Sequence, residues 1–319
     1  MERRYTPSRK LQSIVTLGVL GCALVSNDNQ STHNQTFETA TTTEIVAAAP
    51  APEPTTSFNT AFIEKAWNAA LANHTGEIDI AINDFQSNQI AHTHYPKDSN
   101  SNTFDTASIV KLSTLENLLI KSQLDQEPIT PYENDLAARM IENSDNNATA
   151  ILWNEIGDAP AMDSFWQQQL GTTATTAGTN GYWGNTQTTA IDQLKVVNAV
   201  VNAGTILSPL TKESGAYADE LMRNVEPDQH WGISGGIPEN IPVNLKNGWF
   251  PDSFTTNNYS DTNSWTINSI GYIPNHYSIA ILTRGNRSME DGIALVEKLS
   301  AIAWKCTQHI TLAPKPSKP

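Results

Sequence analysis

Residues 265–284 read WTINSIGYIPNHYSIAILTR. Two runs in this stretch, 265–273 and 277–284, are rich in β-branched and aromatic residues, which predicts two strands. A further strand is predicted upstream at 243–247, and an amphipathic helix follows at 291–306. The C-terminal part of the chain therefore predicts three strands closed by one helix.

The N-terminal part of the domain predicts a helix followed by strands. Helical periodicity covers 61–73, and alternating isoleucines predict a strand over 78–85, followed by a second strand at 89–94. Helical patterns fill the middle of the chain, at 105–122, 132–142, 148–156, 159–169 and 189–203. The order helix, two strands, helical middle, three strands and helix predicts an α+β fold, in which an antiparallel sheet carries terminal helices and a separate helical layer.

The first residues predict an export signal. A basic start precedes an apolar run at 14–25 that is too short to span a bilayer. Inside this run, Val19-Leu20-Gly21-Cys22 resembles a bacterial lipobox, whose cysteine is lipidated after cleavage. A plain signal peptide cut a few residues later and an uncleaved anchor also fit this pattern. We expect a signal peptide over 1–25, lipidation at Cys22 and an exported protein, either an envelope lipoprotein or secreted.

Composition divides the rest of the chain into three parts. Residues 26–56 are rich in Asn, Thr, Ala and Pro and contain few large apolar residues, which predicts a disordered linker. A second disordered segment is predicted for the tail at 312–319. Between them we expect one continuous domain, 57–311, without an internal linker or repeat.

Charge and cysteine content limit the partners. A formal net charge of −14 argues against nucleic acid as a ligand and against attraction to anionic lipid, so membrane contact is expected only through the lipid anchor. The two cysteines, Cys22 and Cys306, leave no intrachain disulfide if the first is lipidated or removed. No Cys/His cluster has zinc spacing, and His92 and His94 are interpreted as solvated residues of an edge strand. We expect no metal, no organic cofactor and a monomer.

The sequence FDTASIVKL, residues 104–112, carries the first candidate for chemistry. Asp105 is expected to cap the helix predicted here, and a spacing of three places Ser108 and Lys111 on one helix face. A serine hydroxyl becomes a good nucleophile only when a nearby base takes its proton, and a neutral lysine one turn away can do so. The N–H groups at a helix start can also bind an oxyanion. Alone, this spacing is common by chance.

Two further motifs are SDN at 144–146, in a polar stretch between two helical patterns, and KNG at 246–248, on a predicted strand. Each has an ordinary structural explanation. The first can be a helix N-cap, and the second a hairpin turn, since Asn-Gly is a strong turn signal. Alternatively, the glycine lets the backbone approach a ligand closely.

Taken in order, S-x-x-K at 108–111, SDN and KNG resemble the motif set of the class A β-lactamases and penicillin-binding proteins. The resemblance extends to SDNNATAILWNEIG, to TTAIDQLKVV and to the last two strands, and covers about 62–302. It implies a five-stranded antiparallel sheet flanked by helices, with an all-helical lobe. Because Ser144 follows Ser108 by only 36 positions, fewer than in the class A enzymes, we expect this lobe to be reduced.

The resemblance implies catalytic roles for three residues. Ser108 would be the acylated nucleophile, and Lys111 would be its activating partner. Ser144 would relay a proton to the leaving nitrogen. Asp145, between the relay serine and the next asparagine, would be structural.

The resemblance implies substrate binding at five positions. Asn146 would hold the substrate amide, and Lys246 would supply positive charge toward a substrate carboxylate and the relay hydroxyl. The usual KTG hydroxyl is replaced by the amide of Asn247, which can still donate a hydrogen bond. The oxyanion hole would combine the N–H of the nucleophile with that of Trp249, directly after Gly248, and the indole would narrow the cleft.

One expected residue is missing from the pattern. The family carries a deacylating glutamate on the loop before the TTAIDQ helix, and here that loop, residues 171–187, reads GTTATTAGTNGYWGNTQ and contains no acid. Hydrolysis of an acyl-enzyme needs a base to activate water, which contributes about 10²–10⁴-fold.

We therefore expect a serine hydrolase that forms an acyl-enzyme at Ser108, on β-lactams or a related amide or ester, and releases it slowly. A peptidase or esterase acting on another acyl donor fits the same residues. Two hypotheses without turnover stay open beside it. One is a lipoprotein that binds or senses β-lactams or cell-wall peptides, and the second is a structural envelope lipoprotein.

Overall fold

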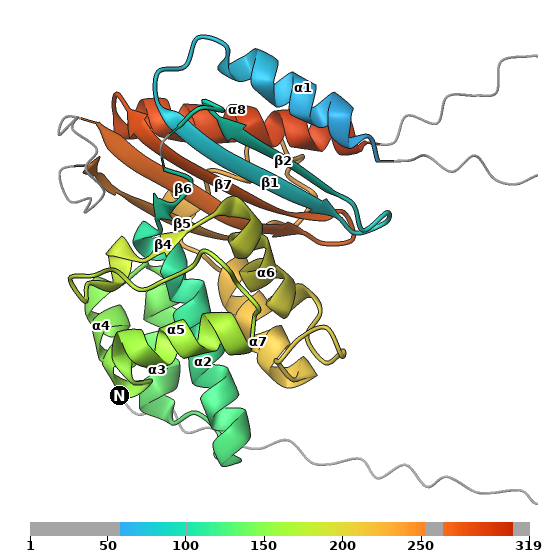
Figure 1. Ribbon diagram of the computed structural model, residues 1–319. Coiled ribbons are helices and arrows are strands. Elements are labelled where there is room, and N and C mark those ends of the chain that lie inside the picture. The colour runs from blue at the N-terminus through green and yellow to red at the C-terminus, as the bar shows by residue number, and fades with distance from the viewer. Residues whose placement is uncertain (1–57, 100, 253–263, 309–319) are drawn as a thin grey trace, which may run out of the picture. The chain divides into compact units, whose positions relative to one another are not determined.

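The computed structural model describes residues 58–99, 101–252 and 264–308. At its centre lies a five-stranded antiparallel sheet with strand order β2-β1-β7-β6-β5 (Figure 1). Its strands are β1 (Glu77–Asp84), β2 (Ile90–Tyr95), β5 (Asn244–Pro251), β6 (Trp265–Ile273) and β7 (Tyr277–Asn286). The sequence predicts all five, although β5 continues beyond its predicted end.

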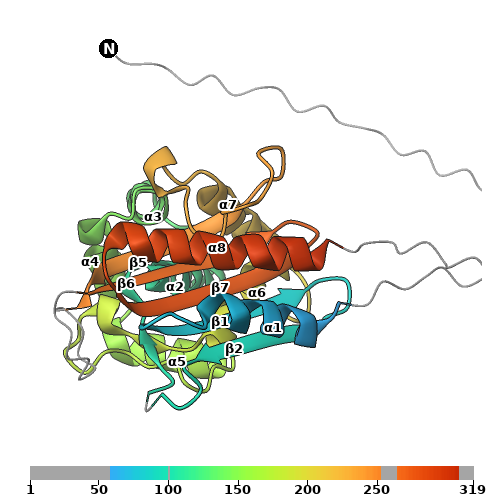
Figure 2. The ribbon, with the colours of Figure 1, turned by 90° about the horizontal axis from the view of Figure 1, so that it is seen from above.

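Two helices cover one face of the sheet. The first and last helices, α1 (Thr60–Leu71) and α8 (Met289–Thr307), lie side by side across it (Figure 2). Both are predicted from helical periodicity. Between them, the buried indole of Trp67 donates through Nε1 to the carbonyl of Leu299 at 3.1 Å. This bond satisfies the polar edge of a large buried ring.

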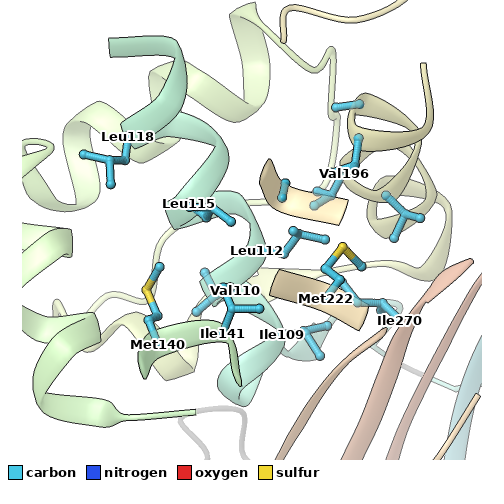
Figure 3. Packing of buried hydrophobic residues seen from close by; sticks show 14 of the residues in the cluster. Ile109, Val110, Leu112, Leu115, Leu118, Met140, Ile141, Val196, Met222 and Ile270 are labelled. Atoms are coloured by element: carbon cyan, nitrogen blue, oxygen red, sulfur yellow. The ribbon is translucent and has the colours of Figure 1, made fainter. Parts of the chain in front are cut away.

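The other face of the sheet carries the helical lobe. Its helices are α2 (Val110–Asp125), α3 (Pro131–Glu142), α4 (Asn146–Glu155), α5 (Asp158–Gln168), α6 (Ala190–Val201) and α7 (Lys212–Arg223). Leu112 of α2 lies in one apolar cluster with Met222 of α7 and Ile270 of β6 (Figure 3). The lobe and the sheet therefore share a core, and the start of α2 lies at their junction.

One helix and one small sheet are absent from the sequence predictions. Helix α7 was missed although its residues are strongly amphipathic, and Gly215 is the residue that lowers its helical propensity. The glycine is needed there, since a Cβ would come within 2.0 Å of the Ala203 Cβ on the preceding segment. A small second sheet pairs β3 (Phe104–Asp105) with β4 (Gln187–Thr188), strands too short to show a period.

The prediction that Asp105 caps a helix is wrong. Asp105 belongs to β3, and its carboxylate accepts hydrogen bonds from the side chains of Asn185 and Gln187, at 3.1 and 2.8 Å. The helix instead starts with a 3₁₀ turn, η1 (Ala107–Ile109), whose N-cap residue Thr106 makes no side-chain capping bond. The carboxylate thus holds the loop before α6 rather than the helix start.

The edge-strand histidines are less free than expected. His92 and His94 lie on edge strand β2, but both rings approach Oδ1 of the buried Asp79, at 2.6 and 3.4 Å. The same carboxylate accepts the backbone N–H of Ala190, at the start of α6, at 2.6 Å. The interpretation as solvated residues is therefore incomplete, since this cluster ties the edge of the sheet to the helical lobe.

Some predictions concern residues outside the described ranges, namely the signal at 1–25, Cys22, the linker at 26–56 and the tail at 312–319. Among the helices that the structure describes, none combines the length and apolar character needed to cross a bilayer. The same ranges contain no group of three or more His, Cys, Asp or Glu side chains placed to hold a metal ion. Cys306 is a free, half-buried thiol.

Candidate active site

Ser108 lies in η1, where the helical lobe meets β5 and β6. The turn is held from two sides, because Thr106 N donates to Thr186 O at 2.8 Å and Asn268 Nδ2 donates to Thr106 O at 3.0 Å. Directly before the serine, Ala107 has a left-handed backbone with φ of 48°. For a residue with a Cβ, that conformation costs roughly 1–2 kcal/mol. A rigid frame thus sustains backbone strain beside the nucleophile.

Lys111 is buried one turn further along, on α2. Its Nζ lies 2.6 Å from Ser144 O, 3.0 Å from Ser144 Oγ and 2.8 Å from Asn146 Oδ1, and 4.9 Å from the centre of the Trp183 ring. Burial lowers the pKa of Lys111 to about 7, against the opposing influence of the Asp145 charge. The amine is therefore partly neutral near pH 7, which an activating base requires.

Lys246 on β5 reaches the same hydroxyl. Its Nζ lies 3.1 Å from Ser144 Oγ and 3.0 Å from the carbonyl oxygen of Asn247. Burial, together with the charge of Lys111, lowers the pKa of Lys246 well below its usual range. Two buried amines beside one oxygen disfavour two ammonium charges at once, so their titrations are coupled. The hydroxyl of Ser144 is placed to pass a proton between them.

The loop that carries Ser144 is fixed by the start of α4. Asp145 is the N-cap residue of this helix and accepts two backbone N–H bonds from its first turn, and it also pairs with Arg139. The N–H of Ala148 and the Arg139 guanidinium hold the pKa of the Asp145 carboxyl below its usual range. Ser144 itself is left-handed, with φ of 57°. Asp145 therefore has the structural role that the sequence predicts.

Gly248 brings β5 against the backbone of Ser108. A Cβ at this position would lie 2.7 Å from the backbone nitrogens of both Ser108 and Ile109, so only glycine permits the contact. The strand thus sets the backbone around Trp249 next to the N–H of the serine. The assignment of these two N–H groups as oxyanion donors stays a prediction that this close approach favours.

Asn247 does not face the substrate pocket. Its side chain is 1% exposed, and Nδ2 donates to the carbonyl oxygens of Gln229 and Trp231, at 2.8 and 3.1 Å. Both amide hydrogens are engaged, so the expectation that they bind a substrate carboxylate is corrected. The reason is the alternation of the strand, since neighbours in a strand point to opposite faces. The amide fixes the segment at 229–231 against β5.

A pocket of about 470 Å³ opens at Ser108. Its lining comprises Ala107, Ser108, Asn146, Asn180, Tyr182, Trp183, Asn185, Trp249 and Phe250. This lining, within the described part of the chain, includes no carboxylate. The segment at 180–185 occupies one wall and comes from the loop in which the family's glutamate is expected. Sequence reasoning missed these residues as lining, although the density of rings and amides in NGYWGN was a signal.

Asp105 lies behind this wall rather than in it. Burial raises the pKa of the Asp105 carboxyl to about 6, although the amides of Asn185 and Gln187 act in the opposite direction. Its 2% exposure and its place outside the pocket lining keep it from direct contact with a pocket water. Asp105 therefore positions the wall and is not itself a candidate base.

One expected contact is not formed. In the described residues, the Ser108 hydroxyl makes no hydrogen bond to Lys111, whose Nζ is instead directed to Ser144 and Asn146. Catalytic hydrogen bonds often tighten only when substrate is present, so this geometry leaves Lys111 a candidate base. The structure thus brings together Lys111, Ser144, Asn146 and Lys246, with Ser108 at the mouth of the same site.

A sequence profile of the β-lactamase enzyme family matches residues 125–307, more than half of the chain. The matched range includes Ser144, Asn146 and Lys246 and begins after Ser108 and Lys111. The sequence motif around the nucleophile and the profile match are therefore separate observations.

Solved structures with a similar fold cover most of the domain. A class A β-lactamase from Bacteroides cellulosilyticus has a TM-score of 0.64 at 15% identity, over 77% of this chain and 97% of that chain. A β-lactamase from Chitinophaga pinensis has a TM-score of 0.61 at 15% identity, over 76% of this chain and 98% of that chain. For PBP-A the TM-score is 0.61 at 15% identity, over 78% and 97% of the two chains. At these identities the likeness shows the fold.

Among curated proteins, LppW of Mycobacterium tuberculosis, which carries a provisional lipoprotein name, is 25% identical over 156 residues. The alignment covers 47% of this chain and 49% of that protein, so the chain spans about half the length of the curated relatives it matches. The profile match over more than half of the sequence, on a fold shared with class A β-lactamases, shows that this chain belongs to the β-lactamase enzyme family.

Proposed function

We propose that this protein is an exported serine hydrolase that forms an acyl-enzyme at Ser108, on β-lactams or a related amide or ester, and releases it slowly. The observation that carries the proposal is the position of Ser144 Oγ, 3.0 Å from Lys111 Nζ and 3.1 Å from Lys246 Nζ. This arrangement provides a base, a proton relay and a positive charge beside a pocket that Ser108 lines.

Acylation follows from these positions. The Ser108 oxygen attacks the carbonyl carbon of the substrate, and its proton passes to the neutral amine of Lys111. When the tetrahedral intermediate collapses, the C–N or C–O bond breaks, and Ser144 gives its proton to the leaving atom. Lys111 then returns a proton to Ser144, so that the amine is neutral again. The product is an ester on Ser108, and the charge of Lys246 stabilises the developing negative charge nearby.

Slow release follows from the pocket wall. A water that attacks the ester must lose a proton, and amides and rings line the pocket where a carboxylate is needed. PBP-A, which shares the fold, is known from a mutant solved as an acyl-enzyme complex with penicillin G. That complex supports the idea that this fold can hold a long-lived penicillin ester.

Intact-mass measurement after incubation with a fluorescent penicillin tests the proposal. We expect one covalent adduct on the wild-type protein and none on Ser108→Ala. A matched control, Ser164→Ala on the exposed face of α5, should be labelled like the wild type. An adduct that survives Ser108→Ala, or no adduct at all together with no esterase activity, contradicts the assignment.

Lys246→Ala tests the electrostatic role separately. This variant should lose more acylation rate with carboxylate-bearing substrates than with neutral esters, because the role assigned to Lys246 is to supply positive charge toward a substrate carboxylate. Equal losses for the two substrate classes count against the role of Lys246.

The second candidate function is a lipoprotein that binds or senses β-lactams or cell-wall peptides without turnover. Among the described residues that line the pocket there is no acid, which favours this function, and so does the lipoprotein name of LppW. Turnover of a chromogenic cephalosporin separates the two, since a sensor is acylated or occupied once and releases no further product. Labelling with an alkynyl palmitate that is lost in Cys22→Ser tests the envelope anchor.

A further inference from the structure

A second and larger pocket lies away from Ser108. It has a volume of about 910 Å³ and shares no lining residue with the pocket of the nucleophile. Its walls come from α6, from α7 and from the β1–β2 and β6–β7 turns, which meet at one end of the sheet (Figure 1). The two turns are joined by the bond from Phe85 N to His276 O, at 2.9 Å. The pocket is therefore built on fixed elements.

Side-chain amides dominate the polar part of this pocket. They belong to Asn83, Gln86, Asn88, Asn198, Asn202 and Asn275. Each amide offers two N–H donors and a carbonyl acceptor without a net charge. Within the described residues, the side chains of Gln86, Asn202 and Asn275 make no hydrogen bond to protein, so their donors and acceptors are available to a ligand.

Three of the amides form a directed chain. Ser278 Oγ donates to Asn198 Oδ1 at 2.7 Å, Asn198 Nδ2 donates to Asn83 Oδ1 at 3.4 Å, and Asn83 Nδ2 donates to Asn88 Oδ1 at 3.4 Å. The chain runs from the buried sheet to the exposed turn, and it ends at the NH₂ group of Asn88. A fixed order of donors and acceptors is thus presented at the pocket surface.

The charged side chains in the lining are largely neutralised or peripheral. Asp219 accepts bonds from the Tyr272 hydroxyl and, at 2.7 Å, from Asn244 Nδ2, and it pairs with Arg223. The other charged lining residue is Lys212, which is exposed. The half-buried ring of Phe85 adds an apolar surface beside the amides. This chemistry suits a neutral ligand with many hydroxyl or acetamido groups and an apolar face.

We propose that this pocket binds a neutral oligosaccharide. Sugar hydroxyl groups donate and accept at once, as side-chain amides do, and the C–H face of a sugar ring can pack on Phe85. An extended peptide fits less well, because it needs a free strand edge. No residue of the edge strand β2 lines the pocket, and β1 and β7 are paired on both sides.

Isothermal titration of the full chain with chitotriose, and separately with maltotriose, tests the proposal. We expect saturable binding of at least one trisaccharide, weakened at least fivefold by Asn88→Gly and by Asn202→Ala. Glycine keeps the positive φ of 55° at position 88, so the turn is preserved. Two matched controls, Asn154→Ala on the exposed face of α4 and Ser108→Ala, should bind like the wild type.

Amide chemical shifts of the wild-type protein provide a second measurement that does not depend on the folding of any variant. Trisaccharide should shift signals at 83–88, 198–202 and 275 and leave the Ser108 turn unchanged. Absence of saturation with both sugars overturns the proposal, and so do shifts confined to the Ser108 pocket. Stronger binding of a capped trialanine peptide, with the same dependence on Asn88, would assign the pocket to peptides instead.

Discussion

Lys111 and Lys246 come from a helix and a strand in different layers, yet their amino groups lie 3.0 and 3.1 Å from one oxygen, that of Ser144. Both are buried, and the pKa of each is lowered. Ser144 therefore connects a candidate base, Lys111, to a candidate source of positive charge, Lys246. The protonation state of either amine affects that of the other.

The first prediction concerns pH. Because burial lowers the pKa of Lys111 to about 7, the neutral amine becomes rarer below that pH. We expect the rate of Ser108 acylation to fall about tenfold per pH unit below 7 and to level off above it. Stopped-flow labelling with fluorescent penicillin between pH 5 and 9 measures the profile. Arginine cannot lose its proton in this pH range, so Lys111→Arg should lose most of the acylation rate. It should also lose the rise of that rate between pH 5 and 7.

The second prediction concerns Gly248. A Cβ there meets the Ser108 and Ile109 nitrogens at 2.7 Å, so Gly248→Ala must displace backbone at the expected oxyanion site. We expect acylation to slow by about 10²–10³-fold, the usual effect of losing one oxyanion donor. Gly171→Ala is the control, because its Cβ meets nothing within 4 Å and only its φ of 63° is strained. Similar acylation rates in the two variants would remove Gly248 from the site.

The third prediction adds the missing acid. Asn180 lines the pocket on the wall where a glutamate is expected, so Asn180→Glu places a carboxylate beside the ester. We expect the lifetime of the penicillin adduct to shorten at least tenfold, a cautious part of the roughly 10²–10⁴-fold that a well-placed general base supplies. Asn180→Gln has the same length without the base and should leave the lifetime unchanged. Equal lifetimes for both variants would show that another factor limits release.

The fourth prediction concerns Glu116 on α2. It is fully buried, and in the described residues neither carboxyl oxygen has a hydrogen-bond partner, so burial raises its pKa well above the usual range. Glu116→Met should raise the free energy of unfolding by about 1–3 kcal/mol, the cost of an unsatisfied buried group. Because the pKa of Glu116 is higher in the folded than in the unfolded protein, the wild type loses stability as pH rises from the unfolded pKa through the folded pKa. The stability gained by Glu116→Met should therefore grow with pH.

Urea unfolding at pH 5 and pH 8 measures this difference. Glu155→Met, an exposed change on α4, should alter stability by no more than about 0.5 kcal/mol at either pH. A destabilised Glu116→Met protein would mean that the carboxyl has a stabilising partner.

The fifth prediction concerns the edge of the sheet. The hydrogen bond to Asp79 raises the pKa of His92 above its usual value. Its stabilising contribution is therefore complete below the unfolded pKa and is lost as pH rises through the folded pKa. His92→Gln should lower the melting temperature at pH 5.5 and have a smaller effect at pH 8.5. The exposed control His230→Gln should show no such trend, and a pH-independent loss at His92 would indicate packing alone.

The motifs located most of the site because their chemistry requires particular residue types. A candidate nucleophile, an amine one turn away and a second amine on a strand could be proposed at Ser108, Lys111 and Lys246 without coordinates. The direction of the Asn247 side chain could not be predicted. Neighbouring residues of a strand point to opposite faces, and which face borders the pocket depends on how the strand pairs in the sheet.

The pocket wall at 180–185 and the role of Asp105 also required the structure. The sequence of the wall shows no helical or strand periodicity. The Asp105 carboxylate contacts Asn185 and Gln187, which lie about 80 positions further along the chain. Helix α7 was missed for a local reason, because Gly215 is a poor helix former that close helix packing demands.

If Ser108 is acylated as proposed, the position of the Ser144 hydroxyl makes penicillin labelling a measure of how the helical lobe docks on the sheet. Lys111 reaches it from the helical lobe and Lys246 from the sheet, so loosening either layer separates the groups that are proposed to activate the serine. A chain that keeps its secondary structure but loses this docking would remain visible to circular dichroism while becoming inert to the drug. The fraction of purified molecules that accept the label would then report how much of the protein is correctly assembled.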